Sequence, residues 1–590
     1  MVAALTSGGA GFEVDCDPEK MSRLLALLHV PSALALLHAP SALRLVPNPS
    51  ARALTSARAG AQLCVAGGVD TGTALRALAD AAKDDVRGIA RSDADVPILP
   101  DSVYYIGAAF RSWLGSADPI AVGRDPRLSS QSLATAFCQG ADACDAGPAT
   151  TPAMLEALLG PTATFSGSVI ITASHLPGEW NGLKLFSRQL GRGLNKKEVK
   201  QVMELAVQLG TDATRGSPDA LLPVPVLDGY MVGYIEKLKA AVRSAAGTGD
   251  SAAEPLRGMR VCVNPGNGAG GFFAAAVLAP LGADTRSSLH LEPDGTFPNH
   301  MPNPEERAHE EATTAAVAAS GAEVGVMLDT DVDRCGLIDG MRSPPEPVNK
   351  NRLIALCSRV ALEAAGGAGV IVTDPVTSAG MGRYIAGCGG AHDRYKMGYR
   401  NVIDRAAETW PEPALLAIET SGHSAWRDNS FVDDGTYTAA RLIGRLARAR
   451  REQQDPRLGL LDLVGDALQE PRESIKVKMA VASGLGGVPD AEIALCAALR
   501  RTAERTAGWT IEPVNHDGLR CAVGSTGWLI IRGSLHEPSV SVQTESDEEG
   551  GTAAICRQLL QFEQGECEAA GIDLEPLRKR AAMATAAGAW

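Results

Sequence analysis

The chain alternates short apolar runs with glycine-rich turns and alanine-rich stretches, and this alternation limits its fold more than any other feature. The runs lie at 167–175, 260–283, 323–331, 369–387 and 414–423, and each contains a polar cluster. A strand followed by a turn and a helix, repeated, is typical of α/β layers. Open α/β sheets place ligand sites beyond the carboxyl ends of their strands. The polar clusters are therefore the candidate functional sites.

Three polar, linker-like breaks at 244–255, 340–351 and 467–474 divide the chain. A length of 590 residues allows about three to five domains. The last piece carries two segments, "TIEPVNHDGLRCAVG" and "GWLIIRGSLHEPSVSVQTES", that predict paired strands. We therefore predict an α/β protein with three similar mixed α/β domains and a C-terminal α+β domain. The predicted parts are a leader at 1–79 and domains at 80–250, 251–345, 346–470 and 471–590.

The leader has an unusual composition. Residues 21–69 contain four arginines and no Asp or Glu, as in an organelle transit peptide, although the duplicated "PSALALLHAPSAL" also fits a low-complexity repeat. Its most apolar part, "LLALLHVPSALALLHAPSALRLV", is interrupted by two histidines and two prolines. A spanning helix needs about 20 uninterrupted apolar residues. We expect a poorly ordered targeting segment and no membrane span.

Charge and cysteine usage exclude several classes of protein. The chain has 55 basic and 69 acidic residues, a net charge of −14, so its average surface repels nucleic acid and anionic lipid. An anionic ligand must then be bound by a local cationic site. The twelve cysteines form no CxxC pair, which argues against structural zinc or a disulfide framework.

The segment "DTDVDRCGLID" places Asp329, Asp331 and Asp333 directly after the apolar run "VGVML". Alternating carboxylates at a strand end can converge on one hard divalent cation, and Arg334 can offset surplus negative charge. An EF-hand loop is excluded because its sixth and twelfth positions hold Arg334 and Gly340. A phosphatase loop with a nucleophilic aspartate and a solvated acidic turn remain as alternatives.

The segment "ITASHLPGEWNGLKLF" combines Ser174, His175 and Lys184 after a strand-like run. Ser174 could be a nucleophile, His175 could orient it, and Lys184 could act as a general acid or bind phosphate. A helix cap with ordinary surface side chains explains the same residues if they stand alone.

Three further clusters suit sugars and phosphates. "ETSGHS" offers a carboxylate, hydroxyls and an imidazole to sugar hydroxyls, although a helix cap is an alternative. Arg124 and Arg127 in "GRDPRLSS" suit phosphate or a surface ion pair. Arg532 and Ser534 in "IRGSLHEPS" suit a phosphate cradle or a plain hairpin loop.

Taken in order, these clusters resemble the four loops of the α-D-phosphohexomutase superfamily, which contains phosphoglucomutases, phosphomannomutases and phosphoglucosamine mutases. The loops are "TASHLPGEWNGLK", "DTDVDR", "ETSGH" with "DDGTYTAA", and "RGSLHEP"; "DDVRGIA", "NPGNGAGG" and "FPNHMPNPE" add support. The resemblance extends from about residue 80 to the C-terminus. It implies a heart-shaped, four-domain molecule with a central cleft, which is a monomer or a dimer.

The resemblance also implies roles for single residues. Ser174 would carry the phosphate, and Asp329, Asp331 and Asp333 would hold one Mg²⁺ that also touches phosphorylated Ser174. The implied reacting centre consists of His175, Lys184, Arg124, Arg334 and His423. The implied substrate contacts are Glu419, Ser421 and Gly422 to the sugar, and Arg532, Ser534 and His536 to the phosphate that is not reacting.

The function implied is interconversion of hexose 1-phosphate and hexose 6-phosphate, with glucose 1,6-bisphosphate as intermediate and activator. Phosphoglucomutase or phosphomannomutase activity is the first expectation. Phosphoglucosamine mutase, a non-catalytic sugar-phosphate binding protein and a metal-dependent phosphatase are the alternatives. The sequence departs from the family at Leu176, Ile418, Ser541 and the loop at 532–538, which resembles that of plant and algal members. With the leader, this favours the chloroplast stroma, with the cytoplasm as alternative.

Overall fold

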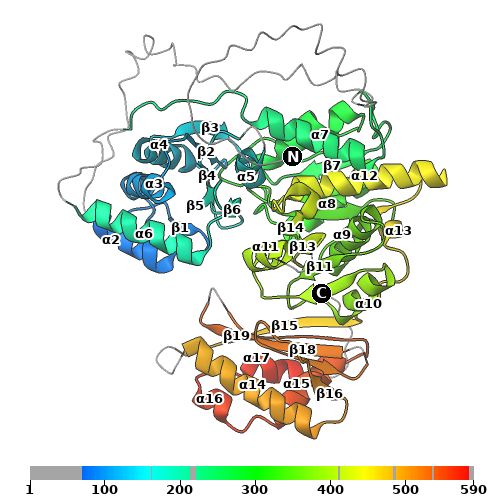
Figure 1. The fold of residues 1–590 in the computed structure, drawn as a ribbon. Coiled ribbons are helices and arrows are strands. Elements are labelled where there is room, and N and C mark those ends of the chain that lie inside the picture. The colour runs from blue at the N-terminus through cyan, green and yellow to red at the C-terminus, as the bar shows by residue number, and fades with distance from the viewer. Residues whose placement is uncertain are drawn as a thin grey trace, which may run out of the picture. The chain divides into compact units, whose positions relative to one another are not determined.

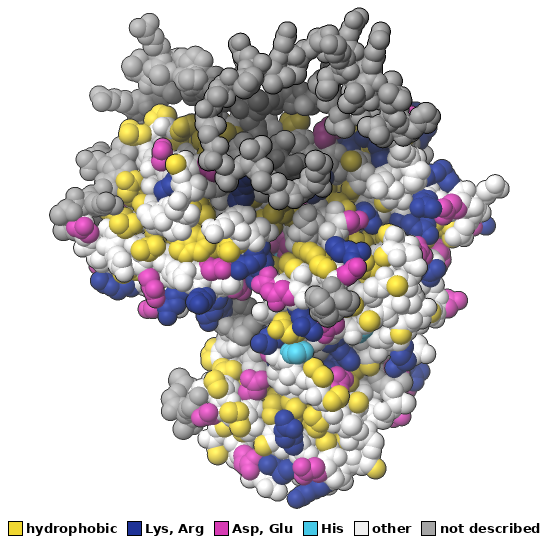
Figure 2. All heavy atoms as spheres, viewed as in Figure 1, with side chains coloured by type: hydrophobic (Ala, Val, Ile, Leu, Met, Phe, Trp, Pro, Cys, Tyr) yellow, Lys and Arg dark blue, Asp and Glu magenta, His cyan; other side chains and the backbone are white. Residues whose placement is uncertain are grey.

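A computed structural model describes residues 69–160, 163–212, 221–250, 252–408, 412–482, 487–525, 527–534 and 537–583 (Figure 1). The transit-like composition falls mainly on residues before 69, outside the described part of the chain. Within that part, none of the helices combines the length and the apolar character needed to cross a membrane. On the face drawn in Figure 2, acidic and basic side chains are interspersed. The net negative charge is therefore not gathered into a single patch on that face.

The first domain is a mixed sheet in the order β1-β5-β4-β2-β3, with β6 beside β5. Strand β4 is parallel to β2 and antiparallel to β5. The strands are β1 (Val86–Ile89), β2 (Ile120–Arg124), β3 (Cys144–Pro148), β4 (Gly167–Ile171), β5 (Trp180–Ser187) and β6 (Arg192–Gly193). The helices are α2 (Thr71–Ala81), α3 (Pro100–Leu114), α4 (Ser130–Ala141), α5 (Thr151–Leu159) and α6 (Lys196–Thr211).

Helix α2 corrects the predicted end of the leader. The Asp70 side chain accepts a hydrogen bond from the Thr73 amide and so caps the helix. Leu75 and Leu78 are fully buried in the core of the first domain, where they pack with Ile106. Because burying an apolar side chain stabilises the fold by about 1.5–3 kcal/mol, residues 71–79 belong to the domain and not to the leader.

The second domain has a four-stranded sheet in the order β10-β9-β8-β7. Strands β7 and β8 are parallel, and β8 and β9 are antiparallel neighbours along the chain. The strands are β7 (Val261–Asn264), β8 (Val324–Leu328), β9 (Cys335–Asp339) and β10 (Glu346–Pro347). The helical segments are α7 (Met231–Ala245), η2 (Ala269–Gly271), η3 (Phe273–Leu278), η4 (Ala279–Leu281) and α8 (Arg307–Ser320).

Helix α7 corrects the predicted boundary at residue 250. Its buried residues Leu238 and Val242 belong to the same apolar cluster as Val261 and Val263 of β7. The helix therefore packs with the second sheet, although the linker-like composition of 244–255 suggested that the second domain begins after it. The polar stretch is a loop inside this domain.

The third domain has a sheet in the order β12-β11-β13-β14, in which only β14 is antiparallel to its neighbour. The strands are β11 (Val370–Thr373), β12 (Ala391–Arg394), β13 (Leu416–Ile418) and β14 (Ser424–Trp426). The helices are α9 (Asn351–Ala364), α10 (Ala379–Gly387), α11 (Tyr399–Glu408), η5 (Arg427–Asn429), α12 (Gly435–Gln453) and α13 (Leu460–Val464). Leu442 and Ile443 of α12 share one core with α7, so the second and third domains are packed together.

The fourth domain is a fully antiparallel sheet in the order β15-β19-β18-β17-β16. Its strands are β15 (Glu473–Ala480), β16 (Trp509–Ile511), β17 (Leu519–Val523), β18 (Gly527–Gly533) and β19 (Ser539–Ser546). Helices α14 (Gly487–Arg505), α15 (Gly551–Gln561), α16 (Glu566–Ala569) and α17 (Glu575–Ala582) belong to the same domain (Figure 1). Arg520 joins it to the third domain by donating hydrogen bonds to the carbonyls of Pro375 (2.7 Å) and Thr377 (3.2 Å).

The predicted fold class, three α/β domains followed by an α+β domain, is confirmed. One local expectation is wrong. The runs at 167–175, 323–331 and 414–423 lead into the antiparallel strands β5, β9 and β14 and not into helices. Each of these three polar clusters therefore lies in a short loop held at both ends by the same sheet.

Candidate active site

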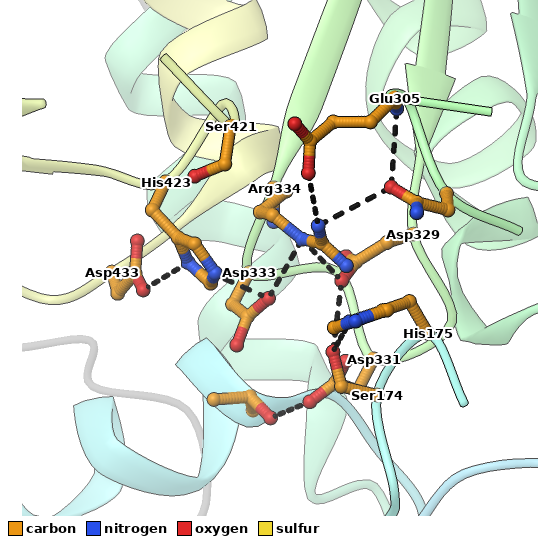
Figure 3. Close-up of polar contacts among 12 residues, drawn as sticks. Ser174, His175, Glu305, Asp329, Asp331, Asp333, Arg334, Ser421, His423 and Asp433 are labelled. Atoms are coloured by element: carbon orange, nitrogen blue, oxygen red, sulfur yellow. Dashed lines mark hydrogen bonds and ion pairs between the residues drawn. The ribbon is translucent and has the colours of Figure 1, made fainter. Parts of the chain in front are cut away.

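The three strand-to-strand loops of the first, second and third domains meet at one centre (Figure 3). The hydroxyl of Ser174, after β4, donates a hydrogen bond to Asp329 Oδ2 at 3.3 Å. Arg334, which ends the β8–β9 loop, pairs as an isolated antiparallel bridge with His423 of the β13–β14 loop. Residues predicted from separate motifs are thus brought together by the fold.

Ser174 has an unusual backbone conformation, with a φ of 51°. A left-handed conformation in a residue other than glycine costs about 1–3 kcal/mol, so neighbouring groups must hold it. The Ser174 amide donates to Thr172 Oγ1 at 2.9 Å, and the guanidinium of Arg127 donates to the Ser174 carbonyl. Arg127 is itself fixed by Asp125 at 3.0 Å, and both side chains are fully buried. This support fixes the Ser174 backbone so that its hydroxyl faces Asp329.

The three aspartates form a buried anionic cluster. Asp329, Asp331 and Asp333 are all fully buried, and one oxygen from each lies within 4.8 Å of the others. Lys184 Nζ lies 2.7 Å from Asp331 Oδ2 and 2.5 Å from Asp333 Oδ2, and Arg334 Nε lies 3.1 Å from Asp329 Oδ2. Buried carboxylates at this separation require cations.

The same cluster fits a divalent metal ion. Within the described residues, the second oxygens of Asp331 and Asp333 are buried without a hydrogen-bond partner. Buried polar atoms without partners are rare and usually mark a ligand, a water or an ion. Oxygen donors of this kind are the ligands that Mg²⁺ prefers. The donor set therefore matches a hard cation beside Ser174.

The surroundings shift the pKa values of Asp329 and Asp333 in opposite directions. Burial and the neighbouring charge of Asp333 raise the pKa of Asp329 well above its usual value. Burial also acts against ionised Asp333, but the charges of Lys184, His423 and Arg334 outweigh it and lower the Asp333 pKa. The surroundings therefore favour ionisation of Asp333 over that of Asp329 before a cation adds its own charge.

The two histidines of the centre have opposite protonation. His175 Nδ1 lies 3.4 Å from Ser174 Oγ, and burial together with Arg334 lowers the His175 pKa to about 2. Burial also disfavours charged His423, but Asp433 at 2.6 Å and Asp333 at 3.8 Å raise its pKa to about 9. At neutral pH the centre thus holds one neutral and one charged imidazole.

The β13–β14 loop carries the predicted sugar contacts. Glu419 Oε1 accepts a hydrogen bond from the Gly398 amide at 2.8 Å, and Ser421 Oγ lies 3.5 Å from Glu419 Oε2. Burial and the charge of Asp374 raise the Glu419 pKa to about 7. Gly422 has a φ of 96°, and a Cβ there would lie 2.6 Å from the Cys335 carbonyl oxygen. Only glycine allows the loop to approach β9 this closely.

The predicted phosphate loop lies in the fourth domain. Arg532 Nη1 lies 3.3 Å from Asp517 Oδ2, and the Ser534 amide donates to the Ser539 carbonyl at 2.9 Å. Ser534 Oγ accepts a hydrogen bond from the Glu537 amide at 3.2 Å. His536 lies outside the described residues. The described part of the loop therefore forms a tight turn at the end of β18.

Arg124, which is predicted to lie at the reacting centre, is the last residue of β2. Its guanidinium forms an ion pair with Asp145 at 2.6 Å, because β2 and β3 are adjacent parallel strands. It lines a cavity of about 630 Å³ whose other walls include Thr150 and Phe272. The arginine of the same motif that contacts the Ser174 loop is Arg127.

Sequence reasoning also missed several residues of the centre. Thr151 at the start of α5 donates its amide to the Asp331 carbonyl at 2.9 Å and its hydroxyl to the Asp331 carboxylate. Tyr399 stacks on His423 with ring centroids 4.9 Å apart. Asp433 could have been found, because it begins the quoted segment "DDGTYTAA". No motif marked Thr151 or Tyr399.

Three family models match the chain in order. They describe phosphoglucomutase/phosphomannomutase alpha/beta/alpha domain I at residues 81–210, domain II at 233–342 and domain III at 349–457. The second match begins within α7 and agrees with the packing of that helix.

Whole-chain comparisons agree with these matches. A phosphomannomutase/phosphoglucomutase of Pseudomonas syringae pv. tomato is 30% identical over 404 residues, 67% of this chain and 78% of that protein. A phosphoglucosamine mutase of Frankia casuarinae is 28% identical over 459 residues, 75% of this chain and 86% of that protein. The crystal structure of a phosphoglucomutase/phosphomannomutase family protein from Burkholderia thailandensis has the same fold, with a TM-score of 0.67, 24% identity, and coverage of 84% of this chain and 98% of that one. The chain therefore belongs to the phosphoglucomutase/phosphomannomutase family of the α-D-phosphohexomutase superfamily and is a phosphohexomutase.

Proposed function

We propose that the chain interconverts hexose 1-phosphates and hexose 6-phosphates through a phosphate carried on Ser174. The observation that supports this most directly is the 3.3 Å contact between Ser174 Oγ and Asp329 Oδ2 inside the buried aspartate cluster. A serine that serves only as a helix cap has no need of three carboxylates and two cations around it.

Asp329, Asp331 and Asp333 are the residues that would hold Mg²⁺. When bound, the ion neutralises charge on the transferring phosphoryl group. The chain contributes positioning and charge through Lys184 and Arg334, which already face the aspartates. Phosphoryl transfer depends mainly on positioning and electrostatic stabilisation. These side chains are of the types that provide both.

In the proposed cycle, the bond between phosphorus and Ser174 Oγ breaks while a bond forms between phosphorus and a sugar hydroxyl oxygen. The hydroxyl proton must leave the sugar, and the serine oxygen must gain a proton. In net terms the proton of the sugar hydroxyl ends on Ser174 Oγ. The 3.4 Å separation supports His175 as the residue that orients this oxygen, because its lowered pKa makes it a weak base. The resulting 1,6-bisphosphate turns round, and its other phosphate returns to Ser174 by the reverse step.

Glu419 and Ser421 are proposed to contact sugar hydroxyls, because both lie in the β13–β14 loop that carries His423. Arg532 and Ser534 are proposed to bind the phosphate that is not transferred. Glucose and mannose phosphates are the first candidates. The similarity to the Frankia phosphoglucosamine mutase supports glucosamine phosphate as the second.

The test is the Ser174→Ala variant. It is expected to lose conversion of glucose 1-phosphate to glucose 6-phosphate and to lose the phosphate mass increment on the peptide containing residue 174. Full activity in this variant would refute the assignment. Rates on glucose, mannose and glucosamine 1-phosphates identify the preferred sugar, and release of free phosphate without isomerised sugar would indicate a phosphatase.

We further propose that the acid-free composition of residues 21–68 directs the chain to the chloroplast stroma. A fluorescent protein fused behind residues 1–68 should enter chloroplasts, and uniform cytoplasmic fluorescence would contradict this.

A further inference from the structure

One face of the sheet in the fourth domain carries a row of cationic side chains. Strand pairing sets Lys478 of β15 opposite Ser541 of β19, and Ser541 opposite Arg532 of β18. Directly paired residues of antiparallel strands point to the same face, with Cβ atoms about 4.5–5.5 Å apart. Lys478, Ser541 and Arg532 therefore form one line across three strands. Lys476 lies in the next line, opposite Gln543.

The opposite face of this sheet is covered by helices. Val477, Met479, Val540 and Val542 alternate with the polar residues of β15 and β19 and are buried in one cluster with residues of α14, α15 and α17. Because side chains alternate along a strand, the lysines and Arg532 project from the other face. On the same face, Trp528 and Ile530 of β18 pack against third-domain residues.

The cations of this face are close enough to influence one another. Burial, followed by the charges of Arg532 and Lys478, lowers the pKa of Lys476. Lys478 forms an ion pair with Glu537 at 2.9 Å, with side chains 53% and 56% exposed. Exposed pairs of this kind contribute little to stability, so Lys478 can exchange Glu537 for a more highly charged anion.

Hydroxyl groups lie beside the cations. Ser539, two residues before Ser541 on the same strand, is 7% exposed, and within the described residues its Oγ is buried without a hydrogen-bond partner. Ser541 Oγ donates to the Arg532 carbonyl at 3.3 Å. A phosphate group has three acceptor oxygens and about two negative charges, so it can use a guanidinium, an ammonium and a hydroxyl together.

One carboxylate acts on a cation of this face and on a cation of the reacting centre. Glu305, from the loop before α8, lies 3.6 Å from Arg334 Nη1 (Figure 3). The same carboxylate acts electrostatically on Lys476.

We propose that Lys478 binds, together with Arg532 and Ser539, the phosphate of the hexose phosphate that is not being transferred. Ser541 between the two cations has a small side chain that leaves room for the phosphate. This inference rests on the proposed function, to which it adds a residue from a strand distant in sequence from the phosphate loop.

The test compares Lys478→Met with wild type using glucose 1-phosphate and Mg²⁺. Loss of one charge-assisted hydrogen bond should raise KM by about tenfold to a hundredfold, with kcat changed by less than about threefold because the residue contacts ground and transition states alike. Lys478→Arg should retain most of the affinity. The matched control is Lys579→Met on α17, which is 75% exposed in its side chain and pairs with Glu575.

A KM for Lys478→Met within about twofold of wild type, or equal to that of Lys579→Met, would overturn the inference. Calorimetry of glucose 6-phosphate binding tests the role of Lys478 separately from the proposed function. If wild type shows no isomerase activity while Lys478→Met still weakens glucose 6-phosphate binding, the proposed function fails and the role of Lys478 stands. If wild type is an active mutase and Lys478→Met binds glucose 6-phosphate as wild type does, the role of Lys478 fails alone.

Discussion

Lys184 of β5 and Asp331 of the β8–β9 loop form a buried ion pair between the first and second domains, with 2.7 Å between Nζ and Oδ2. Burial alone would lower the pKa of Lys184, but Asp331 and Asp333 raise it well above its usual value, so the ammonium stays charged. The lysine therefore binds oxygens that the proposed Mg²⁺ would share.

The first prediction concerns Lys184→Met. Removing one partner of a buried pair costs about 3–5 kcal/mol, so thermal unfolding without Mg²⁺ should shift to markedly lower temperature. Mg²⁺ should recover part of this loss and bind more tightly than to wild type, because the competing ammonium is gone. Activity should still fall by about a hundredfold or more. Calorimetry, melting curves and a coupled assay measure these effects, and activity within threefold of wild type would contradict them.

The second prediction concerns metal removal. A chelator should abolish activity and lower the melting temperature, and added Mg²⁺ should restore both, since an ion that binds only the folded state stabilises it. Asp333→Asn should be insensitive to Mg²⁺ in both measurements. The matched control is Asp284→Asn, a half-buried carboxylate whose salt-bridge partner Arg286 is exposed. A chelated wild type that keeps full activity would exclude the metal.

The third prediction concerns Thr151, whose amide and hydroxyl both contact Asp331. Thr151→Val keeps the shape but deprives the buried carboxylate of one donor, which should destabilise the protein by about 1–3 kcal/mol. Mg²⁺ affinity should also change, because the ligand carboxylate loses its support. Thr151→Ser keeps the hydroxyl and should behave as wild type. Equal melting temperatures for the Val and Ser variants would show that the hydroxyl is dispensable.

The fourth prediction concerns pH and Glu419, whose pKa is raised to about 7 from the usual 4.5 by burial and Asp374. Between these values the folded state holds a proton that the unfolded state has lost, so stability falls as pH rises through this window. The full loss above pH 7 is about 3 kcal/mol. Glu419→Gln cannot ionise, and should therefore gain in melting temperature relative to wild type between pH 5 and pH 8. An identical difference at both pH values would contradict the assignment.

Much of the site could be predicted because its residues sit in short motifs at strand ends. The aspartates, Ser174 and His423 each follow an apolar run, and the order of the motifs pointed to one family. Local sequence could not reveal Thr151, since its contact with Asp331 depends on how α5 meets a loop of another domain. For the same reason the ion-pair partner of Arg124 could not be predicted, because Asp145 lies in the neighbouring strand β3.

The fold class could be predicted from the alternation of apolar runs, glycine-rich turns and alanine-rich stretches. Two details of the fold could not. The strands after Ser174 and Asp333 carry the same apolar signal as buried helices, so β5 and β9 were mistaken for helical segments. The boundary at 250 rests on a polar stretch and the end of the leader on a change in composition, and neither signal reports packing. Helices α2 and α7 therefore lie on the other side of a predicted boundary, because their apolar residues fill the adjacent cores.

Because the centre combines residues from three sheets, it is completed only late during synthesis on the ribosome. Ser174 and Lys184 emerge first, the three aspartates follow, and His423 and Asp433 come last. A nascent chain that stops before β13 carries the serine and the acidic triplet but lacks the imidazolium and its carboxylate partner. Under the proposed function, the protein can convert sugar phosphates only after most of its translation is finished.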